Sequence, residues 1–127
     1  MDWIYFVARL GVLEYLVFGT LTGLARARYN VSAPATTGHP TFERYFRVQQ
    51  NTGEQLLVFL PSLWLFGHFV SAPVGAGLGV VFLVGRLVYL RGYVSDPEKR
   101  GRGFLIGFLA STLLLIGGVI GAAWALF

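Results

Sequence analysis

The chain has 127 residues, of which 55% are hydrophobic and only 13% are charged, and its mean hydropathy is +0.64. These values exclude an ordinary soluble domain and indicate an integral membrane protein with a lipid-facing surface. The formal net charge is +4 and cysteine is absent, which excludes disulfides and thiolate metal sites. The two histidines, His39 and His68, are isolated, so we expect no metal site.

Four apolar segments approach the length of about 20 residues that a helix needs to cross the hydrocarbon core. They are Trp3–Leu24, Leu56–Val70 with a polar N-terminal extension, Val74–Leu90 and Phe104–Phe127. The apolar runs are continuous rather than alternating, which favours helices over the strands of a membrane β-barrel. We therefore predict an all-α, four-helix transmembrane bundle that forms a single domain over residues 1–127.

The first apolar segment is predicted to be a retained helix rather than a secretory signal. Arg9 and Glu14 interrupt it. No basic region precedes it, and no small-residue cleavage site follows it.

A polar stretch, Phe42–Glu54, leads directly into the second apolar segment. Charged groups at membrane depth cost several kcal/mol unless they face a partner, a cavity or a ligand. At about 3.6 residues per turn, four polar side chains of this stretch share one side of a helix, and Gln49 projects from nearly the opposite side. The four are Arg47, Gln50, Asn51 and Glu54. If they face a bundle interior, we expect either a pair between Arg47 and Glu54 through Asn51 or a zwitterionic ligand with carboxylate and ammonium groups.

A second polar set lies at the C-terminal end of the third apolar segment. Arg86, Tyr89 and Tyr93 are spaced by three and seven residues and share a helix face, and Arg100 follows in the next loop. Arg26, at the end of the first segment, reaches the same membrane edge. Taken singly, the tyrosines match an interfacial aromatic belt, and the arginines match loop charges or headgroup contacts. The convergence of both polar sets at one edge favours a binding site.

Basic residues are concentrated in two connections and their flanks. These residues are Arg26, Arg28, Arg44 and Arg47 in the first, and Arg91, Lys99, Arg100 and Arg102 in the second. Cytoplasmic loops carry an excess of Lys and Arg, so both connections are predicted to be cytoplasmic and both termini non-cytoplasmic. This split pattern fits membrane orientation and anionic headgroups, and we expect no nucleic-acid binding. We expect the bacterial inner membrane rather than the endoplasmic reticulum.

Small residues and one proline bear on helix shape and assembly. Gly75 and Gly79, and likewise Gly117 and Gly121, have the four-residue spacing of helix-association motifs, and we expect them to support packing between subunits. Pro61 is expected to kink the second helix and to splay its apolar half, because it lacks an N–H and crowds the preceding turn.

Three stretches carry a resemblance to a known family. SAPATTGHPTFER precedes the second apolar segment, RVQQNTGEQ leads into it, and GRLVYLRGYVSDPEKR covers the end of the third segment and its loop. With these motifs in order and four short apolar segments over nearly its full length, the chain resembles the MAPEG family, the membrane-associated proteins in eicosanoid and glutathione metabolism. The resemblance implies a homotrimer whose glutathione sites lie between neighbouring subunits and open toward the cytosol.

The resemblance also implies roles for single residues. Arg100 stands at the position of the arginine that activates the glutathione thiol, since a permanent cation next to a thiol stabilises the thiolate. Gln55 departs from the family pattern, because leukotriene synthase-like members have a tyrosine there, which places one ligand contact in question. The implied glutathione contacts are Arg26, Arg47, Gln49, Asn51, Glu54, Tyr89 and Tyr93.

The implied activity is conjugation of glutathione, as co-substrate, to a hydrophobic electrophile, or reduction of a lipid hydroperoxide, without a metal. The alternative is a non-catalytic lipid-binding or scaffold protein, because the motifs alone do not separate the two. A small transporter or channel has less support, since the sequence shows neither inverted repeats nor paired broken helices. Residues of the second segment that are candidates for contact with the electrophile are Leu56, Phe59, Leu63 and Trp64.

Overall fold

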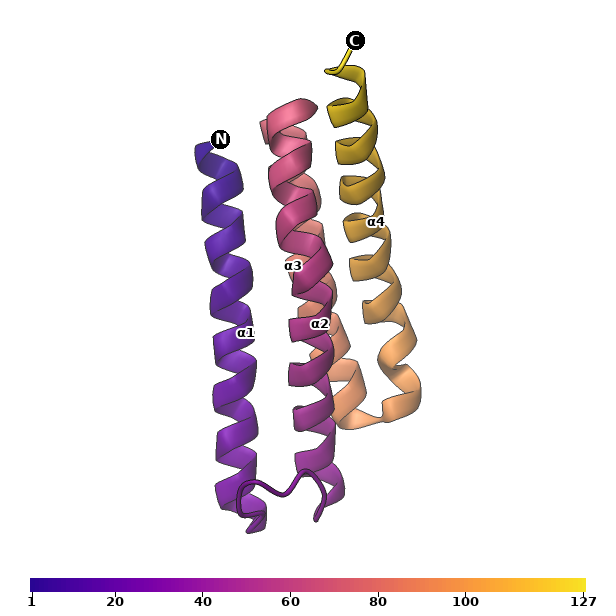
Figure 1. Ribbon diagram of the computed structural model, residues 1–127. Coiled ribbons are helices and arrows are strands. Elements are labelled where there is room, and N and C mark those ends of the chain that lie inside the picture. The colour runs from indigo at the N-terminus through magenta and orange to yellow at the C-terminus, as the bar shows by residue number, and fades with distance from the viewer.

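The computed structural model describes residues 1–127 and consists of four long helices and one short 3-10 helix. The elements are α1 (Asp2–Tyr29), α2 (Pro40–Phe69), α3 (Ala72–Ser95), η1 (Pro97–Lys99) and α4 (Arg100–Trp124). The helices run side by side with alternating direction, and both termini lie at the same end of the bundle (Figure 1). The α1–α2 loop and η1 lie toward the other end (Figure 1). The prediction of an all-α bundle is therefore confirmed.

Three of the four helices are long and apolar enough to cross a membrane, namely α1, α3 and the segment Pro97–Trp124 that includes α4. The exception, α2, has 30 residues and therefore a length of about 45 Å, which exceeds the hydrocarbon thickness. Its first half is the polar stretch identified in the sequence, and this lowers its hydropathy below that of the other three.

Local sequence signals explain where the helices begin and end. His39 caps α2 by accepting a hydrogen bond from the N–H of Thr41 at its Nδ1, 3.1 Å away, and Pro40 occupies the first turn, where its missing N–H costs nothing. Ser71 caps α3 in the same way, because its hydroxyl accepts from the N–H of Val74. The C-terminal end of α1 is capped by Asn30, which adopts the left-handed conformation with φ 56°. Asparagine tolerates this conformation better than most residues. Pro61 lies within α2, which continues through it as one helix.

An apolar core fills the space between the four helices, and its centre is a stacked pair of rings, Phe59 and Phe82, with centroids 3.9 Å apart. Leu56, Phe59 and Leu63 are buried in this core. Their proposed contact with an electrophile is therefore wrong for this chain, because protein side chains already cover them. Of the four candidates on α2, only Trp64 is exposed.

The two glycine pairs are used inside the chain. A Cβ atom on Gly79 would lie 2.6 Å from Val7 Cγ1, and one on Gly117 would lie 2.6 Å from the ring of Phe66. Such distances are too short for real atoms, so these glycines allow α1, α2, α3 and α4 to approach one another. The expectation that they support contacts between subunits is not met, because their open sides already face neighbouring helices of the same chain.

Candidate functional site

The most deeply buried charged group of the chain is the guanidinium of Arg86 on α3, whose residue is 1% exposed. Its Nη2 donates hydrogen bonds to Asn51 Oδ1 at 2.7 Å and to Thr52 Oγ1 at 2.8 Å, and its Nε donates to the same hydroxyl at 3.3 Å. The guanidinium also lies 4.2 Å from the centroid of the Tyr89 ring. Charge-assisted hydrogen bonds and a cation–π contact thus compensate the cost of burying this cation.

This arrangement determines how Asn51 is oriented. Arginine has donors but no acceptor, so the atom of Asn51 that faces Arg86 must be its carbonyl oxygen. The amide nitrogen of Asn51 is then directed away from Arg86, and it remains available as a donor. Asn51 is half-buried, so its oxygen is used in the interior while its nitrogen makes no hydrogen bond to another side chain.

Glu14 brings α1 into the same polar cluster. One of its carboxylate oxygens, Oε1, is buried and has no hydrogen-bond partner in the chain, and the carboxyl group is within electrostatic reach of Arg86. Asn51 and Thr52 thus join α2 to Arg86 of α3 by hydrogen bonds, and Glu14 adds an unpartnered carboxylate oxygen from α1 beside them.

The rest of the predicted stripe on α2 faces outward. Arg47, Gln50 and Glu54 are exposed, whereas Asn51 turns toward the interior and binds Arg86. Arg47 and Glu54 therefore do not pair through Asn51 inside the bundle. On a single chain, these side chains form an open polar face that a ligand or a second subunit can reach.

Arg47 and Tyr93 are brought together, as the sequence reasoning predicts. They line one hollow of about 260 Å³ between α2, α3 and η1, together with Glu43, Arg44 and two prolines. Tyr93 is adjacent to Tyr89, with ring centroids 5.6 Å apart. The hollow thus combines guanidinium groups with an aromatic hydroxyl, which suits a ligand with a carboxylate.

Gln49 lies on another side of α2, next to α1. It lines a groove of about 530 Å³ with Val12, Tyr15, Leu16 and two small residues of α1. A Cβ atom on Gly19 would lie 3.1 Å from Gln49 Nε2, so the glycine makes room for the amide. The predicted separation of Gln49 from the main stripe is confirmed, and the groove beside it is mostly apolar.

The two remaining arginines of the predicted site make contacts of their own. Arg26 donates from Nη1 to Ala35 O at 2.7 Å, and its guanidinium lies 4.6 Å from the centroid of the Phe42 ring. In this chain it fastens the α1–α2 loop to the start of α2. Arg100 begins α4 and donates from Nη1 to Pro97 O at 2.8 Å, but the residue is exposed.

The sequence placed Arg86 in the second polar set but gave it no role of its own. Glu14 was noticed only as an interruption of the first apolar segment, and Thr52 was not singled out. The available signal was the position of two charged residues inside apolar segments, which by itself marks a functional or structural polar cluster. Thr52 gave no such signal, because a threonine in a helix often bonds only to its own backbone.

Comparison with known proteins places the chain in a family. A family model described as the MAPEG family matches residues 4–120. The chain belongs to the MAPEG family. It is 37% identical to human microsomal glutathione S-transferase 2 over 117 residues, which are 92% of this chain and 80% of that protein.

Two further relatives of this MAPEG protein are an enzyme, leukotriene C4 synthase, and an uncharacterized protein. Bovine leukotriene C4 synthase is 40% identical over 94 residues, which are 74% of this chain and 63% of the synthase. An uncharacterized protein of Synechocystis is 45% identical over 124 residues, 98% of this chain and 90% of that protein. Membership of this membrane family, together with three apolar helices, makes the chain a multi-pass integral membrane protein.

Proposed function

We propose that this MAPEG protein is a membrane glutathione transferase that conjugates glutathione to a hydrophobic electrophile. The observation that carries the proposal is the polar face of α2, where Arg47 lines a hollow with Tyr93 and Asn51 is held in a donor orientation by Arg86. The names of two relatives, microsomal glutathione S-transferase 2 and leukotriene C4 synthase, support the assignment at the level of the family.

Glutathione fits this face by charge. Its carboxylates pair with Arg47 and with the amide nitrogen of Asn51, and its ammonium group pairs with Glu54. Tyr93 adds a hydroxyl, and Tyr89, which is only 4% exposed within one chain, lies behind the Tyr93 ring. Arg26, Gln49 and Tyr89 complete the proposed set of contacts.

Gln49 faces α1 while Arg47 faces α3, so one copy of the chain does not present both to one ligand. We therefore propose that each glutathione lies between two subunits, and the resemblance to the MAPEG family implies that the assembly is a homotrimer. The exposed positions of Arg47 and Glu54 agree with a site that a neighbouring subunit completes.

Arg100 is the proposed catalytic residue. A thiol is mostly protonated at neutral pH, and a guanidinium next to the sulfur favours the thiolate without losing its own proton. The thiol proton passes to solvent as the thiolate forms. The thiolate then attacks an electrophilic carbon, a C–S bond forms, and the bond from that carbon to its leaving group, such as the halide of an aryl halide, breaks and the leaving group departs as an anion. With a lipid hydroperoxide, the same thiolate attacks the outer oxygen, the O–O bond breaks, and a second glutathione completes the reduction to alcohol, water and glutathione disulfide.

The hydrophobic substrate has a candidate path in the groove of Val12, Tyr15 and Leu16. Val12 is 53% exposed and Leu16 is 64% exposed, so an apolar compound reaches this groove from the lipid. Gln49 lines the same groove and connects it to the proposed glutathione contacts.

For the membrane, we propose the bacterial inner membrane, with the α1–α2 and α3–α4 connections on the cytoplasmic side, where glutathione is available. A non-catalytic lipid-binding or scaffold role is the competing proposal. Two assays on purified protein, each with and without glutathione, separate the two roles. One measures conjugation of glutathione to a model aryl halide, and the other measures reduction of a lipid hydroperoxide. Saturable glutathione-dependent turnover supports the enzyme, and its absence in protein that still binds lipid supports the scaffold.

A further inference from the structure

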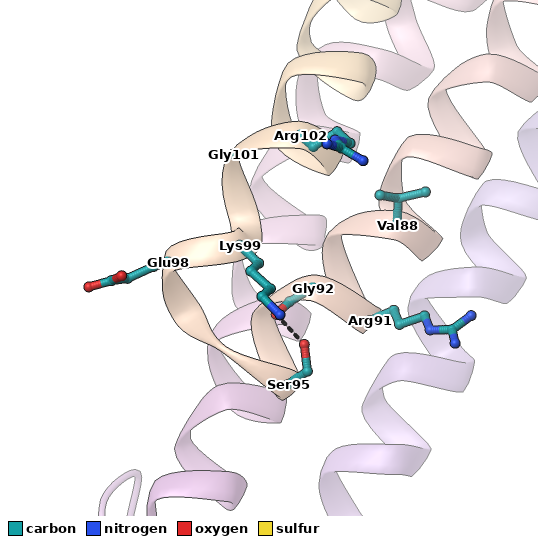
Figure 2. A pocket seen from close by; sticks show the side chains of 8 residues that line it. All are labelled: Val88, Arg91, Gly92, Ser95, Glu98, Lys99, Gly101 and Arg102. Atoms are coloured by element: carbon teal, nitrogen blue, oxygen red, sulfur yellow. Dashed lines mark hydrogen bonds between the residues drawn. The ribbon is translucent and has the colours of Figure 1, made fainter.

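A second polar hollow lies at the corner where α3, η1 and the first turn of α4 meet. It has a volume of about 630 Å³, and its lining includes three basic side chains, Arg91, Lys99 and Arg102, and one acidic side chain, Glu98. None of the residues in the proposed glutathione site lines it. Figure 2 shows the side chain of Glu98 pointing away from the other labelled charged groups, with Val88 between Arg91 and Arg102.

The basic groups of this hollow have no anionic partner within the chain. Three hydrogen bonds that involve side chains lie at this corner: the Ser95 hydroxyl donates to Gly92 O at 3.0 Å, the Glu98 N–H donates to Asp96 Oδ1 at 3.1 Å, and Arg100 Nη1 donates to Pro97 O at 2.8 Å. None of them uses the side-chain cation of Arg91, Lys99 or Arg102. Cations held near one another repel, and the repulsion is relieved by an anion placed among them. A phosphate group matches guanidinium and ammonium donors in both charge and geometry.

Apolar strips lead from the hollow along both helices. On α3, Arg91 is followed toward the opposite end of the bundle by Leu87 and Val84, four and seven residues earlier and about half exposed. On α4, Arg102 is followed by Leu105 and Leu109, three and seven residues later, 54% and 52% exposed. These spacings place each strip on one helix face.

The two strips run in the same direction because α3 and α4 are antiparallel neighbours (Figure 1). Gly85 and Gly107 allow α3 and α4 to approach closely, since a Cβ atom on Gly85 would lie only 2.7 Å from the backbone N of Gly107. The surface therefore has a cationic hollow near one end of the bundle and apolar strips that run from it toward the end where the termini lie (Figure 1). A phospholipid has the same division into an anionic headgroup and apolar chains.

We propose that this corner is a binding site for an anionic phospholipid, whose phosphate lies among Arg91, Lys99 and Arg102 while its acyl chains cover the Leu87 and Leu105 strips. Basic pockets between helices on the cytoplasmic side bind such headgroups in other membrane proteins. The site is independent of the proposed glutathione chemistry, and it stands or fails separately from it.

The test is a titration of delipidated protein in neutral detergent, with bound lipid counted by native mass spectrometry. The lipids are phosphatidylglycerol and phosphatidylcholine with identical acyl chains, and inorganic phosphate is the third probe. We expect a saturable preference for phosphatidylglycerol. The double variant Arg91→Ala/Arg102→Ala should weaken the binding of phosphatidylglycerol roughly 30-fold, because each basic residue near an anionic headgroup typically contributes about 1 kcal/mol and the variant removes two of them.

The matched control is Arg9→Ala/Arg28→Ala, which removes two exposed cations that do not line the hollow and should leave the affinity within about twofold. The charge-keeping variant Arg91→Lys/Arg102→Lys should retain the preference. Equal affinity for the two lipids, equal loss in the control variant, or displacement of phosphatidylglycerol by millimolar inorganic phosphate would overturn the proposal. The last result would point to a site for free phosphate.

Discussion

Nη2 of Arg86 on α3 donates to Oδ1 of Asn51 on α2 at 2.7 Å. This bond joins a buried cation, which no ligand reaches, to a residue of the proposed glutathione site. It leaves the amide nitrogen of Asn51 as the donor that this side chain can offer to a ligand.

Arg86→Ala should lower the free energy of unfolding by about 2–3 kcal/mol, because two acceptors, on the half-buried Asn51 and the buried Thr52, lose a charged donor. The Asn51 amide is then free to rotate, so glutathione affinity should fall as well. Thermal unfolding in detergent measures the first effect, and a glutathione titration of the folded variant measures the second. Arg86→Lys should restore part of both. Unchanged stability in Arg86→Ala would show that Arg86 does not organise this cluster.

Arg47→Ala and Glu54→Gln should each weaken glutathione binding by about 10- to 100-fold, since each removes one charged hydrogen bond to the ligand. Turnover at saturating glutathione should change much less, because these contacts are the same before and during reaction. The shift in melting temperature with glutathione concentration reports the affinity. Arg28→Ala is the matched control, being an exposed arginine near the same membrane edge. A control that loses as much affinity as Arg47→Ala would argue against a specific site.

The proposed trimer predicts complementation between variants. Arg47→Ala and Gln49→Ala remove contacts on different sides of α2, and each alone should bind glutathione weakly. Co-expressed, the two variants form mixed trimers in which some sites have both native residues, so part of the binding should return. No recovery in mixed oligomers, or native mass spectra that show only dimers, would contradict the shared site.

Packing between α3 and α4 predicts opposite effects for two glycines of α3. Gly85→Ala should destabilise the fold by at least 1 kcal/mol, because its Cβ atom would lie 2.7 Å from the backbone N of Gly107. A Cβ atom added at Gly77 has no other atom within 4 Å, so Gly77→Ala should stabilise the protein by up to about 1 kcal/mol, because alanine has the higher helix propensity. Unfolding curves of the wild type and both variants in the same detergent give the two changes in the free energy of unfolding. Equal effects would mean that the close approach of the helices contributes little.

Hydropathy and helical periodicity predicted the all-α bundle and the separate sides of α2 that Arg47 and Gln49 occupy. They did not separate lipid-facing from protein-facing residues, because both environments are apolar. Phe59 and Leu63 therefore read as surface positions although they are buried. The bond between Arg86 and Asn51 was also beyond the sequence, since it depends on how α2 and α3 are placed against each other.

The central claim is that Arg100 activates the thiol of bound glutathione. The direct measurement is ultraviolet difference absorbance in the thiolate band during a glutathione titration of purified wild-type protein and of Arg100→Ala. We predict a saturable thiolate signal in the wild type, and in the variant a loss of that signal with glutathione binding retained within about threefold. A thiolate signal of equal size in the variant, or binding without any thiolate in the wild type, would contradict this role for Arg100.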